Sequence, residues 1–466
     1  MNTNDANQDF SLPQSQPEMV VGPASQPVVP GQAQTPPAPI GQAPEITDNF
    51  IPAMPQNLKE ASLNENLVAA LILKFLYVRG VFNGRSVAEQ LRLPFPIVER
   101  VLYSLKNQLL IGYRGAAVGG DYQYELSPKG LEQARNHMEH CTYFGAAPVS
   151  VPEYVESIKR QSLKNLCPTF DEISNALSDL VVNKSIISQV GQAVRAGKSL
   201  FLFGAPGNGK TSIARRLVRA VNEAIWIPRT LTVGGEIVRL YDPSVHEEDP
   251  LPQTGGLLND GNVDQRWVRI KRPTVVVGGE LSLKHLETNL NTVTGVIESP
   301  IHMKSNCGCL VVDDFGRQRI SSVELLNRWI VPLECGHDYL NLPSGRQMQI
   351  PFEQLVVFST NLRPSDLCDE AFLRRIPYKV QVFDPTEAQF RELWERRIKY
   401  HRIDGDPRWV DYLIETHYRK QDRSMRFCHV DDILCQIREF CDFHAQPLKL
   451  SRETIEIAVN NYFSSI

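Results

Sequence analysis

The chain has 466 residues, of which 42% are apolar and 22% charged, and its formal net charge is −4 at pH 7. This length exceeds what one hydrophobic core ordinarily supports, so about two to three domains are expected. The composition excludes a largely disordered chain, and the net charge excludes a general attraction to nucleic acid, so any such contact must come from a local patch.

Targeting and redox features predict a cytoplasmic protein with no membrane insertion. No Lys or Arg precedes Lys59, and no apolar run approaches the roughly 20 residues that span a bilayer. The nine cysteines are scattered and include no C-x-x-C pair, which is typical of reduced thiols.

Residues 1–56 differ in composition from the rest of the chain. They hold eleven of the 32 prolines, many glutamines and few large apolar residues. Such a segment buries too little apolar surface to offset the entropy of ordering. It is predicted to be a disordered tail that serves either as a tether or as a docking segment.

Residues 57–140 change to a compact helical periodicity and are predicted to form a small domain. The expected elements are helices over 67–78, 86–91 and 95–109, followed by β runs at 110–114 and 122–126. Three helices and a hairpin resemble a winged helix-turn-helix, in which residues 96–107 would form the recognition helix.

The winged helix-like domain has two alternative partners. DNA would be contacted by Arg100, Lys106 and Arg114. Glu99 beside Arg100, together with the nearly balanced charge of the domain, favours protein docking or simple assembly instead.

After a predicted linker at 141–154, an α/β pattern extends over residues 155–384. Its first strand, 199–203, is a short apolar run that leads into G-x-x-x-x-G-K-T and then a helical pattern. The glycines let backbone N–H groups surround phosphate oxygens, and the helix N-terminus adds a favourable dipole. The pattern predicts binding of ATP and Mg²⁺ by Gly204, Ala205, Pro206, Gly207, Asn208, Gly209, Lys210, Thr211 and Ser212.

Two further carboxylates complete the predicted magnesium site. Lys210 is expected to reach the β- and γ-phosphates, and Thr211 to ligate Mg²⁺. A second apolar strand, 309–312, ends in Asp313 and Asp314. Asp313 is expected to hold the hydrated Mg²⁺, and Asp314 to orient or polarise the attacking water.

Groups that would assist hydrolysis follow a third apolar strand. This strand ends at Asn361, which is expected to fix the lytic water beside the γ-phosphate. Arg374 and Arg375 come shortly after it. An arginine from a neighbouring subunit is a recurrent way to stabilise the charge of phosphoryl transfer. The alternative is a local salt bridge to Asp369 or Glu370.

In this order the motifs resemble those of the AAA+ superfamily, with Walker A at 204–211 and Walker B at 309–314. The resemblance implies a P-loop NTPase parallel sheet, a helical lid over residues 385–466, and a homo-oligomer that forms a hexameric ring. The sequence departs from the commonest pattern at Asp314, where Glu is usual. A shorter carboxylate would slow hydrolysis, although Asp-Asp also occurs in the replication-initiator and helicase-loader branch.

The resemblance also suggests further nucleotide contacts. In the lid, Arg426 would be the sensor 2 arginine, and Arg423 and Lys420 compete for that role. Before the first strand, residues 180–194 would supply apolar contacts to adenine, chiefly from Val181, Val182 and Ile186.

Two insertions look like those of a narrower bacterial branch. Residues 339–350 are predicted to form a β-hairpin that resembles a pre-sensor-1 hairpin. Residues 294–308 are similar to the helix-2 insertion of enhancer-binding activators and MoxR-type ATPases, where such loops face a central pore. The pore-contact candidates are Leu290, Asn291, Val293, Arg346 and Gln347. Ordinary surface loops are the alternative.

The segment 266–272, with the sequence RWVRIKR, is basic and contains an aromatic residue. It would contact nucleic acid or an acidic partner, or else form a solvated edge strand whose charges discourage aggregation.

These features predict a chaperone-like AAA+ ATPase that binds and hydrolyses ATP in a ring and remodels a protein client. The alternative is an ATP-switched DNA-binding regulator or helicase-loader-like protein. A third interpretation, an ATP-binding scaffold with little turnover, applies if Asp314 is a poor base.

Overall fold

The computed structural model describes residues 50–221, 223–251 and 263–464. The first 49 residues of the predicted tail lie outside these ranges. Among the described residues, no helix has both the length and the apolar character required to cross a membrane.

Residues 65–140 contain four helices and a three-stranded antiparallel sheet of order β1-β3-β2. Its elements are α1 (Glu65–Arg79), β1 (Phe82–Asn83), α2 (Gly84–Leu91), α3 (Phe95–Asn107), β2 (Ile111–Ala116), β3 (Tyr122–Leu126) and α4 (Pro128–His140). The Asp121 carboxylate accepts the backbone N–H groups of Gly84 and Arg85 at 3.2 and 2.9 Å, which ties the β2–β3 turn to the start of α2. The three helices and the hairpin predicted from the sequence are present.

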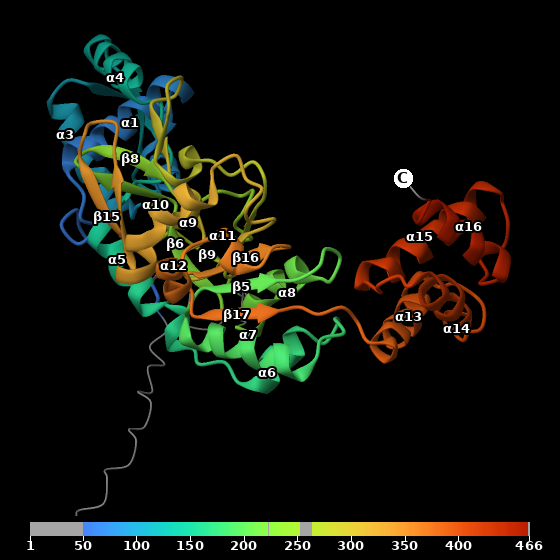
Figure 1. Cartoon of the computed structure of the whole chain (residues 1–466). Coiled ribbons are helices and arrows are strands. Elements are labelled where there is room, and N and C mark those ends of the chain that lie inside the picture. Colours follow the sequence, from blue (N-terminus) through green and yellow to red (C-terminus); the bar gives the residue numbers. More distant parts are fainter. Residues whose placement is uncertain (1–49, 222, 252–262, 465–466) are drawn as a thin grey trace, which may run out of the picture. The chain divides into compact units, whose positions relative to one another are not determined.

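A five-stranded parallel sheet of order β10-β13-β16-β5-β17 forms the centre of the α/β part (Figure 1). Its strands are β5 (Leu200–Phe203), β10 (Thr274–Val277), β13 (Cys309–Val312), β16 (Leu355–Thr360) and β17 (Tyr378–Gln381). Four of them are mostly apolar runs, as expected where helices cover both faces of a parallel sheet, whereas the edge strand β17 has the sequence YKVQ.

Alternate residues of these strands point to two separate cores. Leu200 and Leu202 of β5 pack against the helices that flank the P-loop, whereas Phe201 between them packs on the opposite face against Trp329 and its neighbours. The helices of the α/β part are α5 (Val151–Arg160), α6 (Phe170–Ala176), α7 (Lys184–Ala196), α8 (Lys210–Arg216), α9 (Ile301–Lys304), α10 (Ser322–Cys335), α11 (Pro364–Leu367) and α12 (Glu370–Arg375).

A second five-stranded sheet, of order β11-β12-β8-β7-β4, is built from segments outside the central sheet. Its strands are β4 (Val149–Ser150), β7 (Thr230–Val233), β8 (Glu236–Arg239), β11 (Asn289–Asn291) and β12 (Val296–Glu298). Two antiparallel pairs accompany it, namely β6 (Ile225–Pro228) with β9 (Trp267–Ile270) and β14 (His337–Asn341) with β15 (Gln347–Pro351). The β14–β15 pair is the predicted hairpin.

The C-terminal residues form a helical group with a core of its own, drawn in orange to red in Figure 1. Its helices are α13 (Glu387–His401), α14 (Trp409–Leu413), α15 (Phe427–Phe443) and α16 (Arg452–Tyr462). Side chains of α13, α14, α15 and α16 contribute to the core, with Phe390 and Trp394 fully buried.

Residues 50–56 were predicted to belong to the disordered tail, and for them the prediction is wrong. The Phe50 ring lies 5.3 Å from the Trp267 ring, and Ala53 forms an antiparallel bridge with Val263. A short Pro-containing segment has no core of its own but can still pair its backbone with another part of the chain.

The predicted linker at 141–154 is not a free hinge. Ala147 donates its N–H to the Leu91 carbonyl at 2.8 Å, and both the N–H and the hydroxyl of Thr142 donate to the Thr294 carbonyl. Within the same segment, β4 pairs in parallel with β7. Residues 141–154 therefore fasten the preceding helices to the second sheet.

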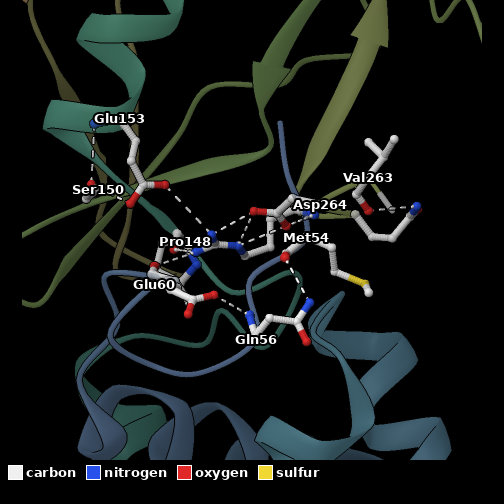
Figure 2. Close-up of polar contacts among 11 residues, drawn as sticks. Met54, Gln56, Glu60, Pro148, Ser150, Glu153, Val263 and Asp264 are labelled. Atoms are coloured by element: carbon white, nitrogen blue, oxygen red, sulfur yellow. Dashed lines mark hydrogen bonds and ion pairs between the residues drawn. The ribbon is translucent and has the colours of Figure 1, made fainter. Parts of the chain in front are cut away.

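The basic segment 266–272 is neither a solvated edge strand nor a free basic patch. Arg266 is only 1% exposed; its guanidinium donates to both oxygens of Asp264 and to the carbonyls of Ala61 and Pro148. Figure 2 shows Pro148, Glu153 and Asp264 around this point. The other cations are also engaged: Arg269 pairs with Asp249, Lys271 with Glu247, and Arg272 donates to the carbonyls of Gln161 and Cys307. The segment joins parts of this chain, which removes it as support for nucleic-acid binding.

Candidate active site

The predicted phosphate-binding loop connects β5 to α8 at the carboxyl end of the central sheet, where open α/β sheets bind ligands (Figure 1). Gly204 begins the loop with φ of 145°, and a Cβ atom there would meet the Val382 carbonyl oxygen at 2.2 Å. Only glycine therefore fits where the loop passes β17.

The Lys210 ammonium lies at the centre of the loop. It donates to the carbonyls of Gly204 and Ala205 at 3.0 Å each, and to Oδ1 of Asn361 at 2.7 Å. Burial lowers the pKa of Lys210, while the nearby Asp313 and Asp314 act in the opposite direction. The structure thus brings the predicted P-loop lysine to the residue that follows β16.

The predicted magnesium ligands also come together. The Oγ1 atom of Thr211 lies 2.8 and 2.9 Å from the two carboxylate oxygens of Asp313. These two side chains carry the oxygen ligands that Mg²⁺ prefers, and they lie side by side, within hydrogen-bond distance of each other. They therefore fit a shared magnesium ion.

Asp314 follows Asp313 in an unusual backbone conformation. Its φ is 49°, and its side chain is exposed. Asp and Asn tolerate this left-handed region better than most residues. The next residue, Phe315, is tied to β16, because its N–H donates to the Ser359 carbonyl at 2.7 Å and its carbonyl accepts the Thr360 hydroxyl at 2.8 Å. The backbone thereby holds Asp314 at the edge of the site.

A cavity of about 1040 Å³ opens over these groups. Its walls include Pro206 through Ser212, both aspartates, Asn361, and the predicted adenine contacts Val181, Val182 and Ile186. Its size suits a nucleotide. Sequence reasoning missed part of the wall, since Leu393, Arg396, Arg397 and Tyr400 of α13 and Asp431 and Asp432 of α15 carry no local motif.

The lid arginine candidates occupy different places. Arg426 pairs with Asp384, whose carboxylate also accepts the Asn208 amide of the P-loop at 2.7 Å. The Arg423 guanidinium instead lies 3.7 Å from the Phe463 ring and donates to the His417 carbonyl. Arg426 is therefore the candidate next to the loop. No sequence signal had indicated Asp384.

Arg374 and Arg375 do not line this cavity. The Arg375 guanidinium pairs with Glu334 at 2.9 Å and donates to the Ala371 carbonyl. Arg374 is exposed and forms no ion pair within the described part of the chain. The alternative of a local pair with Asp369 or Glu370 is not observed for either arginine; Glu334 takes that place for Arg375.

The candidate pore residues lie in and beside two turns, one that joins β11 to β12 and one that joins β14 to β15. Val293 is 88% exposed, and Leu290 is 38% exposed. Arg346 is instead fixed, because its guanidinium donates to the Gly234 carbonyl at 2.6 Å. The turn that carries Val293 is anchored at one side, because the Thr294 carbonyl accepts hydrogen bonds from Thr142.

The predicted DNA contacts lie on α3 and β2. Arg100 and Arg114 are exposed, and the Lys106 ammonium lies 4.2 Å from the centre of the Tyr113 ring. Tyr113 in turn stacks on Tyr122 at 4.3 Å.

Comparison with known proteins gives two findings. Residues 386–461, which span most of α13 to α16, match a family described as a domain of unknown function (DUF8689). Solved structures similar to this chain include a point mutant of RuvB from Thermotoga maritima, at 12% identity and a TM-score of 0.34, over 65% of this chain and 73% of that one. Another is the Thermotoga maritima RuvB Holliday junction branch migration motor, at 12% identity and a TM-score of 0.34, over 60% and 69% of the two chains. No curated protein matches the chain.

Proposed function

We propose that this chain is an ATP hydrolase of the AAA+ type that works as a homo-oligomeric ring and remodels a protein client. The observation that carries the proposal is the convergence of four predicted groups at one edge of the sheet: Lys210 bonds to Asn361, and Thr211 contacts Asp313. These four residues come from distant parts of the sequence, yet they gather beside one Gly-rich loop. A nucleotide-binding site is the simplest explanation for this arrangement.

Each side chain has a defined task at this site. Lys210 exchanges its carbonyl contacts for phosphate oxygens, and Thr211 and Asp313 hold Mg²⁺, which neutralises charge on the phosphates when bound. Asp314 polarises the attacking water, and Asn361 positions it. Val182 and its neighbours contact the base.

The ring model assigns the exposed Arg374 to the site of the adjacent subunit. An arginine supplied from outside stabilises the charge of phosphoryl transfer, and it must be free of internal partners to do so. Loss of this contact after hydrolysis would loosen the interface between subunits. The N-terminal domain, which is hydrogen-bonded to the second sheet and docks the client, would then move.

The test is Mg²⁺-dependent ATP hydrolysis by the full chain. We expect Lys210→Ala to abolish phosphate release, while Lys198→Ala, which alters an exposed lysine just before β5, keeps the wild-type rate. Hydrolysis at the wild-type rate by Lys210→Ala would refute the proposed site.

A second candidate, an ATP-switched DNA-binding regulator, is favoured by exposed Arg100 and Arg114 on a three-helix and hairpin domain. It requires DNA affinity that falls steeply as salt rises. Arg100→Ala and Arg114→Ala should then weaken binding, whereas Arg135→Ala on α4 should not. Salt-independent or absent binding excludes this candidate.

A further inference from the structure

Asp384 lies in the short connection between β17 and α13, where the sheet leads into the C-terminal helices. One of its carboxylate oxygens accepts the Asn208 amide at 2.7 Å and also pairs with the guanidinium of Arg426. This single carboxylate therefore contacts the P-loop and the start of α15 at the same time.

A second contact joins the same two segments. The Cys428 N–H donates to the Gly207 carbonyl at 2.9 Å. A Cβ atom on Gly207, whose φ is 81°, would lie 2.3 Å from the Cys428 sulfur and 3.6 Å from Cβ of Arg426. The first turn of α15 thus packs directly on the loop, which holds Arg426 next to Gly207.

We propose that Asp384 is an internal competitor of the nucleotide: it holds Arg426 as a counterion and so lowers the affinity of the site for phosphates. This inference rests on the proposed function of the site as an ATP site. Asp384 acts through Arg426 and is a positioning residue.

The physical basis is a choice between two anions. A phosphate group presents more charge and more acceptor oxygens than a carboxylate, and a guanidinium binds either one with its planar set of N–H donors. The side chain of Asp384 is 41% exposed and that of Arg426 is 23% exposed, so water screens their ion pair and it can be exchanged. Asn208 is 2% exposed and keeps the carboxylate close after the exchange.

The competition adjusts the site in two ways. While Asp384 holds Arg426, part of the positive charge near the loop is neutralised, and nucleotide binding must displace that contact. Once Arg426 moves to the phosphates, α15 is linked to the nucleotide instead of to the connection before α13. Binding and the position of the C-terminal helices are then coupled through one arginine.

The test measures ATP affinity by calorimetry in the presence of Mg²⁺ for the full chain and for Asp384→Asn, Arg426→Ala and the double variant. We expect Asp384→Asn to lower Kd by about three-fold, the size of a partly exposed ion pair. In the Arg426→Ala background the same substitution should change nothing, since the competed group is absent. Asp384→Ser serves the same comparison if the amide variant does not fold.

Asp411→Asn is the matched control. It removes one negative charge from the same group of helices, but this carboxylate pairs with Arg391 at 2.9 Å and does not line the cavity. We expect the control to leave Kd unchanged. The competitor role would be overturned by any of three results: Asp384→Asn does not increase ATP affinity, it increases affinity equally with and without Arg426, or the control increases affinity by the same factor. The ATP site itself would stand in each case. Absence of ATP binding by the wild-type chain would instead overturn the proposed function.

Discussion

The Arg375 guanidinium lies 2.9 Å from the Glu334 carboxylate, so the second arginine of the α12 pair has an internal partner. Arg374, one position earlier, is exposed and has no ion pair within the described residues. Two adjacent arginines of the same type are thus placed in different electrostatic situations.

This difference predicts unequal effects of two substitutions. Arg374→Ala should leave ATP affinity unchanged and lower kcat by about a thousand-fold, the scale of an arginine supplied in trans. Arg375→Ala should reduce kcat far less, because its guanidinium is already held by Glu334. Steady-state hydrolysis and nucleotide affinity, measured on assembled protein, separate the two. A larger loss of kcat in Arg375→Ala than in Arg374→Ala would make Arg375 the arginine supplied to the neighbouring subunit.

A substitution at Asp314 should affect the hydrolysis step without affecting folding. Asp314→Asn should retain ATP binding and lose at least about a hundred-fold in kcat, because an amide cannot accept a proton from water. Asn also tolerates φ of 49°, so the backbone should be unchanged. Single-turnover hydrolysis measures the step. A wild-type kcat that is itself as low as that of the variant would favour the scaffold interpretation.

Arg266 predicts a large effect on stability. Arg266→Met leaves the buried Asp264 carboxylate without its cation, which should lower the free energy of unfolding by about 3–5 kcal/mol. The control, Arg269→Met, breaks a pair in which Arg269 is 25% and Asp249 37% exposed, and should cost about 1 kcal/mol or less. Urea denaturation gives both values. Equal losses would show that the buried site contributes no more than the exposed one.

The pH dependence of stability should contain a contribution from His429. Burial, helped by Arg426, lowers the pKa of His429 to about 4, and the Tyr418 hydroxyl lies 3.0 Å from its Nδ1. An unfolded histidine has a pKa near 6.5, so the unfolded state binds more protons below that value. Stability is therefore fully present above about pH 6.5 and is lost as the pH falls towards 4.

Because His429 is partly exposed, we expect a loss of about 1–2 kcal/mol over this interval. His429→Gln should flatten the pH profile of the free energy of unfolding, measured in urea between pH 7 and pH 5. A smaller slope should persist, because burial also lowers the pKa of His246. An unchanged slope in the variant would contradict the assignment to His429.

The nucleotide loop and its neighbours could be predicted because their signals are local. Apolar runs that end in polar residues predict parallel strands, and the carboxyl ends of such strands meet at one edge. Lys210 and Asn361, which follow two such strands, lie 2.7 Å apart at that edge. The roles assigned to these side chains remain predictions.

Contacts between distant segments could not be predicted in the same way. The basic residues around Arg266 resembled a charged surface, because their partners Asp249 and Ala61 are placed by folding and have no fixed spacing in the sequence. The linker was misjudged for a similar reason: its Gly and Pro residues indicate where helices stop, but not that β4 joins a sheet.

The pairing of β4 with β7 matters for anyone who shortens this chain. A fragment that starts at residue 155 would lose β4 and expose the backbone edge of β7 to solvent. It would also leave Arg266 without the Ala61 and Pro148 carbonyls. An uncovered strand edge recruits other chains, so such a fragment should aggregate instead of behaving as an independent ATPase.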